Sequence, residues 1–197
     1  MRSLLCILLS MPIFSYSQVD LHNWNDDFYN QYNSSTFQSL EVVHQKIDID
    51  NIDYELFNAA IFYCTNIQRI KYGRKTFSHS PSLENAAQGH SKDMVTYNFF
   101  SHTSPRGGKV SMSDRLAAVG IEYGYKAENI AINNEISPTY WSFALDLVAQ
   151  WMNSEGHKRN ILNSKYITLG CGVYYYKFEY NKYFYVKSTQ NFSSKEI

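Results

Sequence analysis

Two histidines and one glutamate, His102, Glu128 and His157, are the side chains of this sequence whose types could act together in one site. Neutral imidazoles with a carboxylate can hold a divalent metal and leave a position open for water, and zinc is the metal that suits them. Alternatively, a glutamate beside a histidine can act as a general base on water. Both interpretations require the three groups to converge, which their separation along the chain does not establish.

Each of these residues also has a purely structural interpretation. A lone histidine at position 102, in a polar loop, would ordinarily be solvated. Glu128 could tie down loop amides or pair with His102. His157 follows Gly156 near an expected helix end, where the helix dipole favours a protonated imidazole.

The other histidines are not expected in this site. His90 falls on the apolar stripe of an expected helix, so a hydrogen-bonded core or boundary histidine is the better interpretation. The remaining ones have no chemically related residues around them: His22, His44 and His79.

Helices must position most of the candidate residues. Apolar residues recur at helical spacing over 52–72, and Ser80 followed by Pro81 opens a second helix as cap and first residue. A short helix is expected over 113–119. A longer one is expected to start at Ser137-Pro138 and to break at Gly156.

The C-terminal part changes character. Segments 170–178 and 183–190 are rich in Val, Tyr and Phe and flank a polar break, which predicts a β-hairpin. Helices followed by strands favour an α/β/α or α+β sandwich. The polar stretch 18–50 is either a loosely ordered arm or a lead-in that packs on the domain.

The N-terminus has the layout of a secretory signal peptide. Arg2 precedes an apolar stretch over 4–14, and Ser15 and Ser17 are small residues at the cleavage-specifying positions. We therefore expect cleavage after Ser17 and export, with secretion, the cell surface or a periplasm all left open. The structural alternative is a buried N-terminal strand. The apolar stretch is too short to span a bilayer, and no later segment suggests a transmembrane helix.

Charge excludes two classes of partner. Lys plus Arg and Asp plus Glu both total 18, so the formal net charge is zero. No basic excess points to nucleic acid, and no run of charge points to a membrane surface.

Three segments, read together, point to a known family: 101–105 (SHTSP), 127–131 (AENIA) and 151–157 (WMNSEGH). With the downstream Gly170-Cys171-Gly172, this series resembles the CAP superfamily of cysteine-rich secretory proteins, antigen 5 and pathogenesis-related proteins. The bacterial SCP-like extracellular branch is the most similar. The resemblance runs from about residue 55 to 192. We expect a signal peptide at 1–17, an N-terminal arm at 18–50 and a CAP domain at 51–193.

The resemblance implies an α+β fold, an α-β-α sandwich with a central antiparallel sheet between helical layers. It also implies a cleft with two histidines and two acids, three of which match His102, Glu128 and His157. The second acid of the animal and plant branches falls on Ser154, and whether its neighbour Glu155 turns into the cleft is left open. Ala127 also replaces the glycine that usually precedes the first acid.

The family resemblance leaves the activity open, because its members do unlike jobs. We favour a non-enzymatic extracellular module that binds an unknown ligand, lipid or protein, with a divalent metal at His102 and His157. One alternative is a metal-dependent or Glu/His hydrolase of peptidase type, in which Glu128 acts on water. The chain has no Gly-x-Ser-x-Gly or His-Glu-x-x-His motif and no plausible catalytic cysteine. The other alternative is a lipid- or sterol-binding protein.

Cysteine usage yields one further expectation. Cys6 lies in the signal segment, so Cys64 and Cys171 remain after processing and could pair in an oxidising compartment. The resemblance places the first helix against the sheet, which makes contact feasible. Alternatively, both are small buried residues of a helix and a strand.

Overall fold

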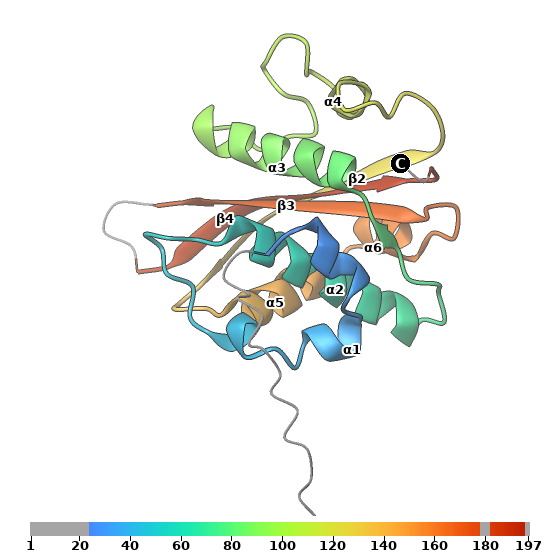
Figure 1. The fold of residues 1–197 in the computed structure, drawn as a ribbon. Coiled ribbons are helices and arrows are strands. Elements are labelled where there is room, and N and C mark those ends of the chain that lie inside the picture. The colour runs from blue at the N-terminus through green and yellow to red at the C-terminus, as the bar shows by residue number, and fades with distance from the viewer. Residues whose placement is uncertain (1–23, 178–181, 196–197) are drawn as a thin grey trace, which may run out of the picture.

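The computed structural model of the chain describes residues 24–177 and 182–195, so the expected signal peptide lies outside the described residues. Figure 1 shows one sheet with a helical layer on each side. Helices α3 and α4 cover one face, and α2 and α5 cover the other with α1 beyond them. The expected α-β-α sandwich is thus confirmed. None of the helices in the described part of the chain has both the length and the apolar content needed to span a bilayer.

Eight helical segments are present in the described residues. The α-helices are α1 (Ser34–Phe37), α2 (Tyr54–Lys71), α3 (Pro81–Thr96), α4 (Met112–Ala117), α5 (Tyr140–Met152) and α6 (Glu155–Leu162). The 3-10 helices are η1 (Asp26–Asn30) and η2 (Glu41–His44).

The sheet has four strands, β1 (Ser78–His79), β2 (Lys126–Glu135), β3 (Thr168–Tyr176) and β4 (Phe184–Ser193), in the order β1-β3-β4-β2. Strands β3 and β4 form the expected hairpin, and β4 also pairs antiparallel with β2. The two-residue β1 pairs parallel with β3, so the sheet is mixed rather than wholly antiparallel. Strand β2 therefore lies at an edge, where loops from both faces of the sheet can meet.

Two helix boundaries differ from the expectation. The long helix starts at Tyr140 rather than at Ser137-Pro138, because Ser137 has φ +52 and Thr139 forms the capping box. The break after it lies at Ser154, which is the N-cap of α6. Gly156 belongs to the first turn of α6 and does not end a helix.

Helix α3 lies directly on β3 because two strand residues have no side chain. A Cβ atom at Gly170 would overlap the backbone of Leu83 and Glu84, and one at Gly172 would overlap the backbone of Gln88. Close helix-to-sheet contact of this kind requires glycine. It fixes the position of the loop that leaves the C-terminal end of α3.

The larger core fills the layer between the sheet, α2 and α5. Aromatic residues from 24–50 are part of it, since Trp24 and Phe37 are buried and pack edge to face at 5.1 Å. This stretch is therefore a packed lead-in over its described residues, not a loose arm. A smaller core, with Leu83 and Leu116, joins α3 to α4.

The expected pairing of Cys64 and Cys171 is wrong for this structure. Both are free thiols, buried on α2 and β3 respectively. Burial raises the pKa of each thiol well above its ordinary value. They serve as small apolar core residues, which is the alternative interpretation.

Candidate functional site

Glu128 is the centre of a buried polar cluster on the edge strand β2. Its side chain is 2% exposed, and both carboxylate oxygens accept hydrogen bonds. Strand β2 positions it because Glu128 points toward α3, while its neighbour Asn129 points toward α6. One strand thereby contributes a polar group to each face of the sheet.

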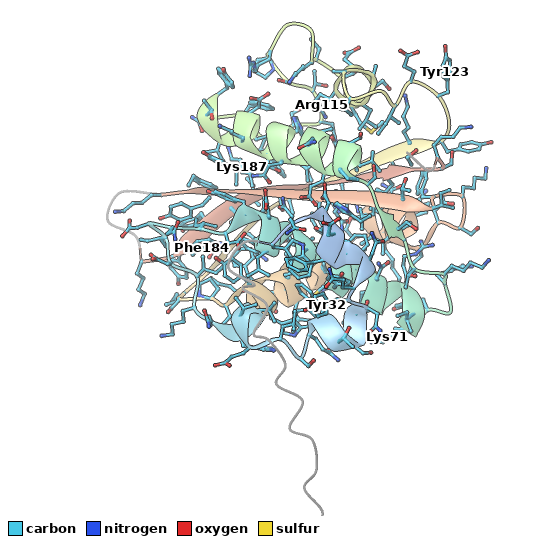
Figure 2. The ribbon with its side chains drawn as sticks, in the orientation of Figure 1. Tyr32, Lys71, Arg115, Tyr123, Phe184 and Lys187 are labelled. Carbon is cyan, nitrogen blue, oxygen red and sulfur yellow. The ribbon has the colours of Figure 1, made fainter. Side chains whose placement is uncertain are left out.

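Arg115 of α4 is the principal partner of Glu128. Its Nη2 donates to Oε2 at 2.7 Å and to Oε1 at 2.9 Å, and the arginine side chain is 3% exposed. The same Nη2 donates to the backbone oxygen of His102 at 3.1 Å. Figure 2 labels Arg115 on the side of the sheet covered by α3 and α4. One guanidinium thus holds both the carboxylate and the loop that carries the histidine.

His102 donates from Nδ1 to Oε1 of Glu128 at 2.9 Å. Because the carboxylate accepts this proton, the neutral ring has its lone pair on Nε2. The His102 side chain is 55% exposed, and the described residues offer Nε2 no hydrogen-bond partner. His102 is therefore an oriented imidazole that presents a free nitrogen at the surface.

The net pKa of Glu128 lies below its ordinary value. Burial alone raises the pKa of this carboxyl, but the hydrogen bond from His102 and the charge of Arg115 lower it more strongly. Asn191 of β4 also stabilises the carboxylate of Glu128 when its amide nitrogen faces that group, since it then donates to Oε2 at 3.2 Å. A low pKa and fully engaged oxygens make Glu128 a poor general base.

His157 reaches the same region from the other face of the sheet. It lies in α6, and its backbone oxygen accepts from the side chain of Asn129 at 3.2 Å. Asn160 donates to Asn129 at 2.9 Å and ties the same helix to β2. Burial and the neighbouring His102 both lower the pKa of His157, so its imidazole is neutral near pH 7.

His90 lies behind the cluster and matches the expected core histidine. Its side chain is fully buried, and Nε2 lies 3.1 Å from the backbone oxygen of Ser101 and 4.0 Å from Oε1 of Glu128. Burial lowers the pKa of His90, with Glu128 opposing that shift. A neutral His90 therefore fixes the loop just before His102.

The structure does not bring Glu155 into this group. Glu155 is exposed on the first turn of α6, and no hydrogen bond or ion pair joins it to the cluster among the residues described. Over 24–177 and 182–195, no set of three or more His, Cys, Asp or Glu side chains is arranged to hold a metal ion. Any metal site here would rest on two imidazoles, with Glu128 behind one of them.

A hollow of about 330 Å³ opens beside His157. Its walls are mostly apolar, with Ser154 at the position of the expected second acid: Phe100, Ile130, Ala131, Ile132 and Trp151 join Ser154, Gln150 and His157. The imidazole of His157 therefore lies beside an apolar surface.

Three residues of the cluster were not identified from the sequence: Arg115, Asn129 and Asn191. Asn129 and Asn191 stand inside or near matched motifs, and their polarity within buried strands was the available signal. Arg115 lies in a short helix, 13 residues along the chain from both His102 and Glu128. Nothing in its local pattern distinguishes it from a surface arginine.

The chain matches the family model "CAP: Cysteine-rich secretory protein family" over residues 62–188. Two proteins of Bacillus subtilis are similar to it in sequence. An uncharacterized membrane protein, YlbC, is 38% identical over 109 residues, 55% of this chain and 29% of its own length. An uncharacterized protein, YkwD, is 38% identical over 108 residues, 55% of this chain and 38% of its own length. The chain thus spans well under half of these relatives.

A solved structure is also similar. It is an extracellular protein containing a SCP domain from Bacillus anthracis, with 32% identity and a TM-score of 0.59. The match covers 76% of this chain and 44% of the other.

Proposed function

The chain belongs to the cysteine-rich secretory protein (CAP) family, and from that premise we propose that it is an exported, non-enzymatic binding module whose cleft takes a divalent metal through His102 and His157. Export is supported by the signal-like N-terminus and by the extracellular protein of Bacillus anthracis to which the chain is similar. The ligand or partner is an extracellular molecule.

One observation carries the metal proposal, the 2.9 Å hydrogen bond from His102 Nδ1 to Glu128. A carboxylate that accepts the proton of one ring nitrogen orients the other nitrogen toward a metal, an arrangement common behind metal-ligating histidines. Zinc suits two neutral imidazoles and leaves positions for water or a ligand atom. Under this proposal His102 and His157 are the metal ligands and Glu128 is the orienting group.

The same geometry disfavours the hydrolase alternative. A general base must accept a proton from water, whereas Glu128 has a lowered pKa and its oxygens already accept from Arg115 and His102. We therefore assign Glu128 an orienting role.

Calorimetric titration of the exported protein with zinc near neutral pH tests the proposal. We expect saturable binding of modest affinity that is lost in His102→Ala and in His157→Ala. His44→Ala is the matched control, because His44 is exposed and lies outside the cluster. Absence of saturable binding by the wild type, or equal binding by both cleft variants, would show that the metal assignment is wrong.

A specific observation also supports a second candidate, an apolar ligand. The 330 Å³ hollow beside His157 has an apolar wall that includes Phe100, whose relative exposure is 46%. Burial of an acyl chain or sterol edge there would be favourable at about 25 cal/mol per Å² of apolar surface. Organic extraction of purified protein followed by mass spectrometry tests this candidate, and an extract free of lipid would contradict it.

A further inference from the structure

A second hollow, of about 660 Å³, lies away from the cleft. Its walls are η1 and the start of α1, the second half of α2, and the segment 76–81. In Figure 2, Tyr32 of this hollow and Arg115 of the buried polar cluster lie on opposite sides of the sheet. The wall formed by η1 and the start of α1 precedes the part of the chain that matches the family model, which starts at residue 62. This hollow is therefore built with a part of the chain that the family match does not include.

One wall of the hollow is rigid and aromatic. The rings of Tyr29 and His79 stack face to face, with centroids 3.5 Å apart and planes 2° apart. Glu84 holds both, since it accepts from the Tyr29 hydroxyl at 2.9 Å and lies 2.8 Å from His79 Nε2. Beside them, the Tyr63 hydroxyl donates to the backbone oxygen of Tyr32 at 3.3 Å. The wall is thus set before any ligand arrives, which lowers the entropic cost of binding.

The rim of the hollow is polar and unengaged. Asp27, Asn30 and Ser35 are exposed, and in the described residues their side chains make no hydrogen bond. No lysine or arginine lines the hollow. The groups on offer are therefore amide, hydroxyl and carboxylate, with no fixed positive charge.

These features select a ligand class by chemistry. An anion is disfavoured, because two aspartates and no lysine or arginine line the hollow. A lipid tail is disfavoured, because it would strip water from the polar rim without replacing the hydrogen bonds. A volume of 660 Å³ is typical of small-molecule sites.

We propose that this hollow binds a neutral saccharide, whose C–H faces lie against the half-buried ring of Tyr32 and whose hydroxyls bond Asp27 and Asn30. Aromatic rings offer a large apolar surface to such faces. Carboxylate and amide groups together accept from and donate to vicinal hydroxyls. The site is independent of the metal cleft and of its proposed role.

Saturation-transfer NMR on the exported protein tests this with a panel of neutral disaccharides: maltose, cellobiose and N,N′-diacetylchitobiose. Spermidine is included as a cation without a sugar ring. We expect at least one disaccharide to bind and spermidine not to. Calorimetry on the best binder then measures the variants Asp27→Ala and Asn30→Ala. Each should weaken binding by about three- to tenfold, the value of one lost hydrogen bond.

Two controls keep the outcomes separate. Asn134→Ala removes an exposed amide elsewhere and should leave saccharide binding unchanged. His157→Ala should also leave it unchanged, while Asn30→Ala should keep the zinc affinity of wild type, so failure of one proposal does not affect the other. The saccharide proposal is overturned if no disaccharide binds, if spermidine alone binds, or if Asp27→Ala and Asn30→Ala bind as wild type does.

Discussion

The Nη2 atom of Arg115 lies 2.7 Å from one oxygen of Glu128 and 2.9 Å from the other, in a place where both side chains are almost fully buried. This pair joins α4 to the edge strand β2 and holds the loop of His102 between them. A buried charge is tolerated only while its partner is present. The orientation of His102 therefore depends on an arginine that does not itself face the cleft.

Replacement of Arg115 by methionine should strongly destabilise the protein. The variant keeps the alkyl volume but leaves Glu128 as a buried, unpaired charge, which costs about 3–5 kcal/mol. Urea unfolding at pH 7 measures the change in the free energy of unfolding. The double variant Arg115→Met with Glu128→Gln should recover part of the loss, because no uncompensated charge remains.

Arg106→Met is the matched control for that substitution. Arg106 pairs with Asp93 at 3.0 Å, but its side chain is 45% exposed and solvent screens the pair. The free energy of unfolding should therefore change far less. Equal losses in Arg106→Met and Arg115→Met would contradict the importance assigned to the buried pair.

Adding a methyl group at Gly170 or Gly172 should separate α3 from the sheet. The new Cβ would overlap helix backbone, which cannot rotate away, so each alanine variant should lose about 3 kcal/mol or more. Gly89→Ala in the same helix is the control, because a Cβ there meets nothing within 4 Å. That variant should gain about 0.5–1 kcal/mol from helix propensity. Thermal and urea unfolding of the three variants measure these changes in the free energy of unfolding.

Much of the fold could be predicted because it depends on local patterns. The apolar spacing over 52–72 predicted α2, the Ser80-Pro81 pair marked the start of α3, and the aromatic run after Gly170 predicted a hairpin. The strand around Glu128 was not predicted. Its buried residues are two polar ones, Glu128 and Asn129, followed by two apolar ones, Ile130 and Ala131, so the sequence shows no alternation of apolar and polar residues.

The cluster was only partly predictable for a related reason. His102 and Glu128 stand in short motifs, whereas Arg115 becomes significant only through contacts that folding creates. The expected disulfide rested on an oxidising compartment and on there being two cysteines left after processing. In the fold, both Cys64 and Cys171 are free thiols packed in the core. Whether two residues distant in sequence come into contact depends on long-range packing, which local sequence patterns do not reveal.

Acid should destabilise the fold below about pH 6.5. The pKa values of His90 and His157 lie below the ordinary value of 6.5, so the unfolded chain binds protons first and the folded state loses stability as pH falls. The pKa of Glu128 is lowered from its ordinary value of 4.5, so this carboxylate also contributes stability that is lost as pH falls, but at lower pH than the histidines. Urea unfolding between pH 7.5 and about pH 4 measures it.

The variant His90→Gln tests how much of the change in unfolding free energy with pH is due to His90. It removes a buried titrating group, so stability should change less between about pH 6.5 and 5 than in wild type. His44→Gln, at an exposed position, should keep the wild-type slope. A wild-type protein whose stability is flat over this range would contradict the assigned pKa directions.

The role of Glu128 can be separated from that of Glu155 by the same substitution at both positions. Glu128→Gln removes the carboxylate that orients His102, and loss of such a group behind a ligand weakens metal binding by about ten- to a hundredfold. Glu155 is exposed and outside the cluster, so Glu155→Gln should bind zinc as wild type does. Calorimetric titration gives both affinities, and circular dichroism establishes that each variant is folded. If Glu155→Gln loses as much affinity as Glu128→Gln, then Glu155 turns toward the ion and the site has a third ligand. If Glu128→Gln binds zinc unchanged while His102→Ala does not, the hydrogen bond between His102 and Glu128 has no orienting role.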